Sequence, residues 1–245
     1  MFCFSQNYNI GNAQLLGNCE QQNDYFAAKQ DKNNLLIIVA DGLTDLPAGR
    51  FASVIAVETL KYNYQHIEKY QNALDYLKQS FGDIDYSIPK NITGNQTGAA
   101  VICGIIQNKK LAWANVGSCS LYLWRKGKII PIHDEVKKRM EYGTLECKKR
   151  DVLLFCTEGI KKGSSELEFK EILSMKKHPY DKAVLLTERI KKRGYSYQKN
   201  GTAVIVEIWF FSKNDSFYNK VLCSTFFQES GQSLRQSLKV LVFRF

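Results

Sequence analysis

Apolar residues along this chain gather in short runs, and the most pronounced run stops at a carboxylate. Six apolar residues at 35–40 are followed directly by Asp41 and Gly42. A run this short, made of Leu, Ile, Val and Ala, is typical of a strand covered on both faces rather than of a helix. It therefore predicts a buried strand that delivers Asp41 to a turn, where the glycine permits close approach of the backbone.

A second strand is predicted just before the first. A short apolar run at 25–28 is separated from the strand at 35–41 by a polar turn. This pattern favours a β-hairpin. The hairpin would bring Asn23 and Asp24 towards the sheet end that carries Asp41.

After this strand, apolar positions recur at helical spacing and predict one helix from Phe51 to His66 and another from Ile67 to Phe81. From residue 97 the pattern changes to strand-like runs separated by polar turns, which predicts an antiparallel meander. A strand that ends at Glu158, two helices and a last strand follow. The expected segments after the first two helices are 99–106, 111–116, 121–125, 128–132, 151–157, 166–175, 179–192 and 203–211.

This order of elements excludes a parallel βαβ array, because the strands come in groups and the helices in pairs. It fits an α+β fold in which two antiparallel β-sheets form a central β-sandwich flanked by pairs of α-helices. With 245 residues and 44% hydrophobic content, the chain can bury one sizeable core. We expect one domain over residues 1–211 and an extension of unknown structure over 212–245.

The chain carries a formal net charge of +10, from 34 basic and 24 acidic residues. Much of the excess lies in four short clusters at 137–139, 148–150, 176–177 and 191–193. These clusters are dispersed, and no aromatic-interleaved RNA motif or recognition-helix signature accompanies them. They therefore predict a solvated basic surface, and binding to nucleic acid stays open only as a disfavoured alternative.

Seven cysteines, an odd number without a Cys-x-x-Cys pair, are typical of reduced thiols in a cytoplasm and disfavour a zinc site. The apolar runs are too short to cross a bilayer. The first residues lack the basic region and apolar stretch of an export signal. We therefore expect a cytoplasmic protein without a membrane segment.

Five blocks of the chain, in order, resemble the motifs of the metal-dependent protein serine/threonine phosphatases of type 2C, the PPM class. The family's Gly-x-Arg-x-x-Asn-Glu-Asp element resembles residues 17–24, and its Ala-Asp-Gly-Met-Gly-Gly-x-x-Gly element resembles 40–49. Asn-Val-Gly-Asp-Ser-Arg with the aromatic strand after it is similar to 115–127. Gly-Asp-x-Leu-Leu-Leu-Cys-Ser-Asp-Gly resembles 150–159, and Asp-Asn-x-Thr resembles 199–202.

The resemblance covers roughly residues 10–211 and implies hydrolysis of phosphoserine or phosphothreonine by metal-bound hydroxide. It implies a pair of Mg²⁺ or Mn²⁺ ions bridged by Asp41, with the carbonyl of Gly42 and the carboxylate of Glu158 as further ligands. Asp24 would be a hydrogen-bonding acid beside them, so Asp41 and Asp24 are the candidate catalytic residues. Hard divalent ions need several such oxygen ligands.

The residues that would hold these ions depart from the family's pattern. Asn23 stands in place of a Glu, Glu158 in place of the shorter Asp, and Lys199 in place of the last Asp. Asp41, Glu158 and Lys199 together carry one net negative charge, where the family's four metal-binding carboxylates carry four. This imbalance disfavours a centre with two metal ions.

The phosphate contacts change as well. Cys19 stands where the family has the arginine that clamps phosphate, and a thiol offers no fork of donors. Ser118 stands in place of the acid at a third metal position. We expect the ammonium of Lys199 to occupy the space of a lost metal ion, held by Asp41, by Glu158 or by both.

Together these residues predict a degenerate type 2C phosphatase domain, a pseudophosphatase without a cofactor that acts in signalling as a regulatory or phosphoprotein-binding module. Its expected partner is a phosphoprotein or a kinase-type signalling protein, and its oligomeric state is left open. The first alternative is a weak but active phosphatase that uses Mg²⁺ or Mn²⁺ on Asp41, Gly42 and Glu158. The second is a nucleic-acid-binding protein with a basic surface.

Overall fold

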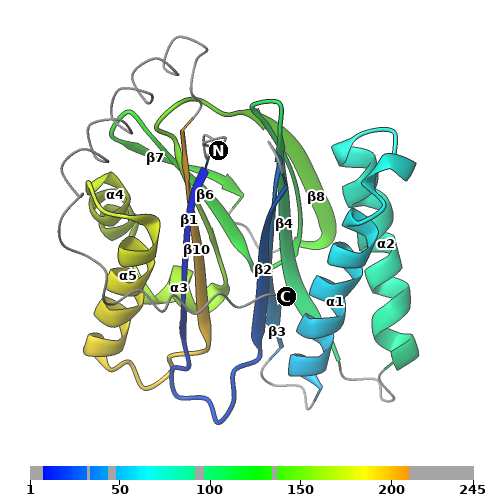
Figure 1. The fold of residues 1–245 in the computed structure, drawn as a ribbon. Helices are drawn as coiled ribbons and strands as arrows, with labels where there is room; N and C mark the ends of the chain where they lie inside the picture. Colours follow the sequence, from blue (N-terminus) through cyan, green and yellow to red (C-terminus); the bar gives the residue numbers. More distant parts are fainter. Residues whose placement is uncertain (1–7, 32–33, 44–47, 92–96, 134–136, 210–245) are drawn as a thin grey trace, which may run out of the picture. The chain divides into compact units, whose positions relative to one another are not determined.

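Two antiparallel five-stranded sheets face each other at the centre of the fold, as Figure 1 shows. The strand orders are β1-β10-β9-β6-β7 in one sheet and β2-β3-β4-β5-β8 in the other. The protein is described by a computed structural model that covers residues 8–31, 34–43, 48–91, 97–133 and 137–209. The strands are β1 (Tyr8–Leu15), β2 (Asp24–Asp31), β3 (Asn34–Gly42), β4 (Ala99–Gln107), β5 (Lys110–Gly117), β6 (Ser120–Arg125), β7 (Lys128–His133), β8 (Lys137–Glu146), β9 (Val152–Cys156) and β10 (Gly201–Ile208).

Helices cover the outer face of each sheet. In Figure 1, α1 and α2 lie against the sheet that contains β3 and β4, and α5 lies against β1 and β10. The helices are α1 (Gly49–Tyr64), the 3₁₀-helix η1 (Ile67–Lys69), α2 (Ala73–Asn91), α3 (Glu158–Gly163), α4 (Glu166–Ser174) and α5 (Pro179–Arg193). This arrangement confirms the predicted α+β sandwich with paired helices on its outer faces. No helix in the described ranges is both long and apolar enough to cross a bilayer.

The described residues all belong to one compact unit, Gln6–Phe210. The extension expected at 212–245 lies outside the described residues. The domain limits at 211 and 212 therefore stay predictions.

The apolar run of β3 is continuous because both of its faces are buried. Its odd-numbered residues from Leu35 to Val39 lie in the core between the two sheets. Its even-numbered residues from Leu36 to Ala40 lie in a second core under α1 and α2. Every side chain in this run is 0% exposed. The hairpin predicted between the first two strands is confirmed, since β2 pairs with β3 along its whole length.

The meander predicted from residue 99 is wrong, although its four strands exist. β4 and β5 pair in one sheet, whereas β6 and β7 pair in the other. The chain therefore crosses between the sheets at 118–119, where a paired turn was expected. A short polar turn looks the same in the sequence whether the next strand pairs with its neighbour or crosses the core, because both faces of the flanking strands are apolar.

Two strands and one helix were missed. β1 was not predicted, and β8 falls in a stretch interpreted as polar and basic. β8 is an edge strand paired with β5 alone, and exposed residues alternate with partly buried ones in 141–146. An edge strand needs few apolar residues. The second helix also starts and ends later than predicted, at Ala73–Asn91, and α3 begins at Glu158, which was expected to end a strand.

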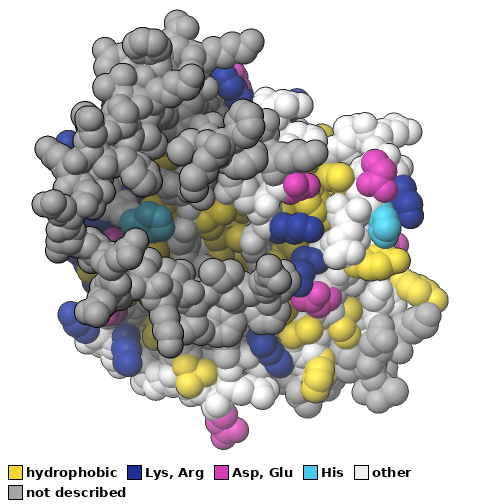
Figure 2. All heavy atoms as spheres, viewed as in Figure 1, with side chains coloured by type: hydrophobic (Ala, Val, Ile, Leu, Met, Phe, Trp, Pro, Cys, Tyr) yellow, Lys and Arg dark blue, Asp and Glu magenta, His cyan; other side chains and the backbone are white. Residues whose placement is uncertain are grey.

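The basic clusters lie on separate elements. They belong to β8, the loop before β9, the loop between α4 and α5, and the end of α5. On the face drawn in Figure 2, Lys and Arg side chains are scattered among hydrophobic and neutral ones. This distribution agrees with the predicted solvated surface.

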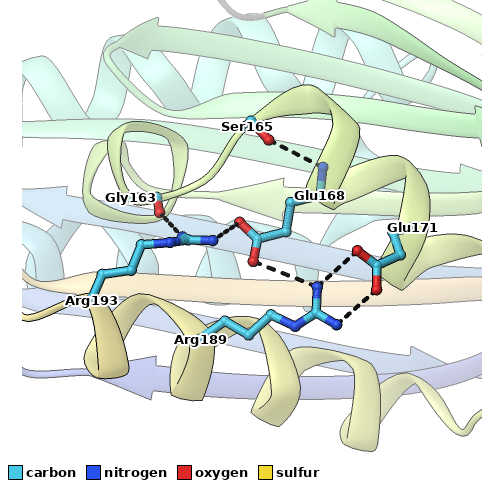
Figure 3. Close-up of polar contacts among 6 residues, drawn as sticks. All are labelled: Gly163, Ser165, Glu168, Glu171, Arg189 and Arg193. Carbon is cyan, nitrogen blue, oxygen red and sulfur yellow. Dashed lines mark hydrogen bonds and ion pairs between the residues drawn. The ribbon is translucent and has the colours of Figure 1, made fainter.

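A network of ion pairs fixes α3, α4 and α5 relative to one another (Figure 3). The nearly buried Glu168 on α4 contacts Arg193 at 2.7 Å and Arg189 at 3.8 Å, both on α5. Arg189 also pairs with Glu171 at 2.7 Å, and Arg193 donates to the carbonyl of Gly163 at the end of α3. These contacts hold the end of α5, and thus the start of the loop that leads into β10.

Candidate functional site

The predicted site residues meet at one end of the sandwich, where β2 begins, β3 ends and β10 begins. In Figure 1 this is the lower end, where the β1–β2 loop and the α5–β10 loop lie side by side. Asp24 lies directly opposite Asp41 in the antiparallel register of β2 and β3. The pairing follows from the hairpin, because the first residue of one strand must face the end of the other.

Asp24 links the two sheets. Its Oδ2 accepts hydrogen bonds from Thr157 Oγ1 at 2.9 Å and from Thr202 Oγ1 at 2.8 Å. Thr157 lies between β9 and α3, and Thr202 lies on β10, so both donors come from the opposite sheet or directly follow one of its strands. Gln14 Nε2 donates to Thr202 Oγ1 at 3.0 Å. Asp24 itself is 0% exposed. The carboxylate is thus held by hydroxyl groups rather than by water.

The two aspartates lie opposite each other in the hairpin, and the pKa of each is raised. Burial, followed by repulsion from Asp24, raises the pKa of Asp41 to about 8. Burial also raises the pKa of Asp24 to about 6, against the lowering effect of its threonine partners. Asp24 Oδ1 is buried and has no hydrogen-bond partner among the described residues.

Asn23 fixes the backbone beside this pair. Its N–H donates to Asn200 Oδ1 at 2.8 Å, and its carbonyl accepts from Ser53 Oγ at 2.6 Å and from the N–H of Gly42 at 3.3 Å. A Cβ on Gly42 would lie 2.1 Å from the carbonyl oxygen of Gly49, so only glycine fits there. Asn23 Oδ1 is buried and accepts no hydrogen bond from the described residues.

Glu158 is the first residue of α3 and is already paired with lysines. Its carboxylate lies 2.8 Å from Lys162 Nζ and 3.6 Å from Lys199 Nζ. Partial burial alone would raise the pKa of Glu158, but the two ammonium groups outweigh burial and hold it below its ordinary value. Lys199 therefore has one of its two predicted partners. Its side chain is 43% exposed. That its ammonium takes the place of a metal ion stays a prediction.

Arg50 is a further cation at the site that sequence reasoning missed. Its Nη1 donates to the carbonyl of Asp24 at 2.6 Å, and its guanidinium lies 4.8 Å from the centre of the Tyr25 ring. The only sequence signal was its position, directly after Gly49 in the first turn of α1. Cys19 lies half-buried in the β1–β2 loop, and Ser118 lies half-buried just after β5.

These residues do not fit a pair of Mg²⁺ or Mn²⁺ ions. Burial raises the pKa values of Asp24 and Asp41 and so disfavours their ionised forms, and Glu158 is already paired with two lysines. Within the described ranges, no group of three or more His, Cys, Asp or Glu side chains is arranged to hold a metal ion. Hard divalent cations need several ionised oxygen ligands, and this donor set offers too little negative charge.

No protein-family model and no curated protein matches this sequence. Solved structures do match the fold. The S. agalactiae serine/threonine phosphatase aligns with a TM-score of 0.71 at 16% identity, over 82% of this chain and 99% of that one. The Mycobacterium tuberculosis serine/threonine phosphatase PstP/Ppp aligns with a TM-score of 0.72 at 16% identity, over 83% and 99%. The PP2C phosphatase domain of SpoIIE from Bacillus subtilis, solved with a fragment of its regulatory domain, aligns at 0.65 and 18% identity, over 84% and 64%.

Identities this low establish the architecture and leave the chemistry to the residues of this chain. The two facing antiparallel sheets and the helices on their outer faces match one known fold. The chain has the fold of the type 2C serine/threonine phosphatases.

Proposed function

We propose that this protein is a pseudophosphatase that binds phosphorylated proteins in cytoplasmic signalling without hydrolysing them through a centre with two metal ions. One observation carries the proposal: positive charges of the protein itself occupy the surroundings of the carboxylates. Lys162 and Lys199 contact Glu158, and Arg50 lies beside Asp24.

The charge balance supports binding of an anion rather than of a cation. Burial and mutual repulsion disfavour a second negative charge on the Asp24–Asp41 pair, so in this proposal the pair and Glu158 together carry two negative charges. Arg50, Lys162 and Lys199 carry three positive charges. A phosphoryl dianion would gain from this excess, whereas a divalent cation would be repelled by it.

Metal binding and turnover test the proposal on the wild-type protein. With millimolar Mn²⁺ and a phosphothreonine peptide, we expect no metal-dependent hydrolysis near the roughly 1 s⁻¹ of ordinary enzymes. Calorimetry should show no specific Mn²⁺ binding, while a phosphoserine peptide library should yield saturable binders. Turnover that needs Mn²⁺ and disappears in Asp41→Asn would establish the active phosphatase instead.

A variant that restores carboxylates sharpens the test. Asn23→Glu, Glu158→Asp and Lys199→Asp, combined in one chain, replace the residues that depart from the family's pattern. This triple variant should gain Mn²⁺ binding that the wild type lacks, because it adds ionised oxygen ligands and removes an ammonium group. Equal Mn²⁺ affinity in the two proteins would contradict the assignment of these positions.

A further inference from the structure

Two hollows lie on either side of the loop that joins α5 to β10. The first, here called the phosphate pocket, has a volume of about 150 Å³ and is lined by Gly159, Lys162, Tyr197, Gln198 and Lys199. The second, here called the loop groove, has a volume of about 440 Å³ and lies between this loop, the end of α5 and the β1–β2 loop. Gln198 lines both hollows, so they adjoin each other.

The loop that separates the hollows is held in place. Gln198 is buried, and its amide donates to the carbonyl of Gly159 at 3.0 Å and to that of Lys199 at 2.9 Å. The backbone carbonyl of Gln198 accepts a hydrogen bond from the backbone N–H of Asn18 at 2.8 Å. The side chain of Asn200 donates through Nδ2 to the backbone carbonyl of Leu16 at 2.8 Å. The two loops form one rigid surface, which lowers the entropy cost of binding.

The phosphate pocket is electropositive. Lys162 and Lys199 both contact the single carboxylate of Glu158, so these three side chains carry one net positive charge. Both lysine side chains are substantially exposed, at 61% and 43%, and their remaining N–H donors face water. A volume of about 150 Å³ equals that of about five water molecules. It suits the five heavy atoms of a phosphate monoester and is too small for a nucleotide.

The loop groove offers apolar surface next to this charge. Leu15, Leu16 and Ile190 line it, and Leu16 is 46% exposed. Tyr195 and Tyr197 stack at 5.4 Å with an angle of 12° between their rings, and Tyr197 is 68% exposed. Tyr195 lines the loop groove with Leu16, whereas Tyr197 lines the phosphate pocket, so the stacked pair spans the two hollows. The groove itself is of a size typical of ligand sites.

We propose that the loop groove and the phosphate pocket together dock one phosphorylated segment of a partner protein. The phosphate of a phosphoserine or phosphothreonine binds in the phosphate pocket against the exposed ammonium groups of Lys162 and Lys199, on the side away from Glu158. An apolar residue next to it enters the groove at Leu16. This inference rests on the proposed function and adds where the partner binds. The two ammonium groups select the dianion, and the groove selects the neighbouring sequence.

The probe is the tightest binder selected from a library of peptides with a central phosphoserine and random flanks. Fluorescence anisotropy measures its affinity for full-length variants whose folding is checked by thermal denaturation. Lys162→Ala and Lys199→Ala should each weaken binding roughly tenfold, the loss expected for one charge-assisted contact. Leu16→Glu should weaken it similarly by closing the groove. Lys192→Ala, which removes a charge from the same surface outside both hollows, should change affinity less than about twofold.

The same measurements separate this inference from the proposed function. If the selected peptide binds but loses affinity in Arg50→Ala and not in Lys162→Ala or Lys199→Ala, the phosphate binds at the aspartate pair and the docking surface is wrong. An equal loss in Lys192→Ala would mean non-specific attraction, and tighter binding of oligothymidylate would mean nucleic acid; either overturns the inference. If the library yields no binder at all, the proposed function fails with it.

Discussion

At the scale of single residues, polar positions of the site differ from the type 2C pattern, whereas at Gly42 the backbone leaves no room for a side chain. The departures include Cys19, Asn23, Ser118, Glu158 and Lys199. Gly42, where a side chain would collide with the start of α1, is retained. A side chain at the surface of a site can be replaced with local adjustment, whereas a close contact between two backbone segments leaves no space for an added side chain.

Replacing Gly42 tests this difference. A Cβ at this position would lie 2.1 Å from the carbonyl oxygen of Gly49 and 2.8 Å from that of Asn23, so Gly42→Ala should destabilise the protein by about 1–3 kcal/mol. Urea unfolding measures the change. Gly82→Ala is the matched control, because Gly82 lies in α2 with nothing within 4 Å of the added Cβ. It should stabilise by up to about 1 kcal/mol through helix propensity. Equal effects at both positions would contradict the close approach at Gly42.

At the scale of elements, the helices on the β10 side are joined through charges as well as through apolar contacts. Ser165 caps α4 by accepting a hydrogen bond from the N–H of Glu168 at 3.2 Å. The Ser-x-x-Glu spacing is that of a capping box, yet the Glu168 side chain reaches across to Arg193 on α5. One residue therefore helps to start α4 and to attach it to α5.

Glu168→Ala should destabilise the protein by about 2 kcal/mol, because it leaves the partly buried Arg193 without its carboxylate. That figure lies below the roughly 3–5 kcal/mol of fully buried pairs, since Arg193 is still 34% exposed. Glu171→Ala removes an exposed partner of Arg189 and should cost less than about 1 kcal/mol. Chemical denaturation of the two variants compares them directly. A larger loss for Glu171→Ala would mean that burial does not set the strength of this network.

At the scale of the whole molecule, one end of the sandwich carries the site and the proposed docking surface together. Strand ends from both sheets and two loops converge there, and Asp24 connects the sheets through Thr157 and Thr202. Protonation at this point therefore affects the stability of the entire fold.

We predict that the wild-type protein becomes less stable as the pH rises from about 5 to 8. The folded-state pKa values of Asp41 and Asp24 are raised, to about 8 and about 6, above the ordinary aspartate value of 3.8. In this window the folded state binds more protons than the unfolded state, and stability falls by up to about 1.4 kcal/mol per pH unit for each extra proton. Stability measured by urea unfolding across the window gives the slope.

Asp41→Asn should flatten this slope, because an amide cannot titrate and no longer repels Asp24. Asp85→Asn is the control, since Asp85 is an exposed carboxylate on α2, and this variant should keep the wild-type slope. Identical pH profiles for the wild type and Asp41→Asn would mean that the pKa of Asp41 is not raised in the folded protein.

The sequence by itself determined most elements and the composition of the site. The unbroken run at 35–40 specified a strand with both faces buried, and the helical periods specified the paired helices, because burial imposes these patterns locally. Asp24 and Asp41 could be placed together because a hairpin register depends only on nearby residues. The presence of Asn23 and Lys199 in place of carboxylates could be read directly from the sequence.

Only the tertiary structure decided how distant segments meet. The crossing between sheets after β5, the edge strand β8 and the place of Glu158 on a helix depend on which surfaces cover one another, and no local pattern records that. The same holds for Arg50, whose distance from Asp24 is set by the packing of α1, and for the pKa values of the aspartates, which are set by burial. The two hollows at the α5–β10 loop exist because segments far apart in the chain pack side by side, and packing of that kind is a property of the folded molecule alone.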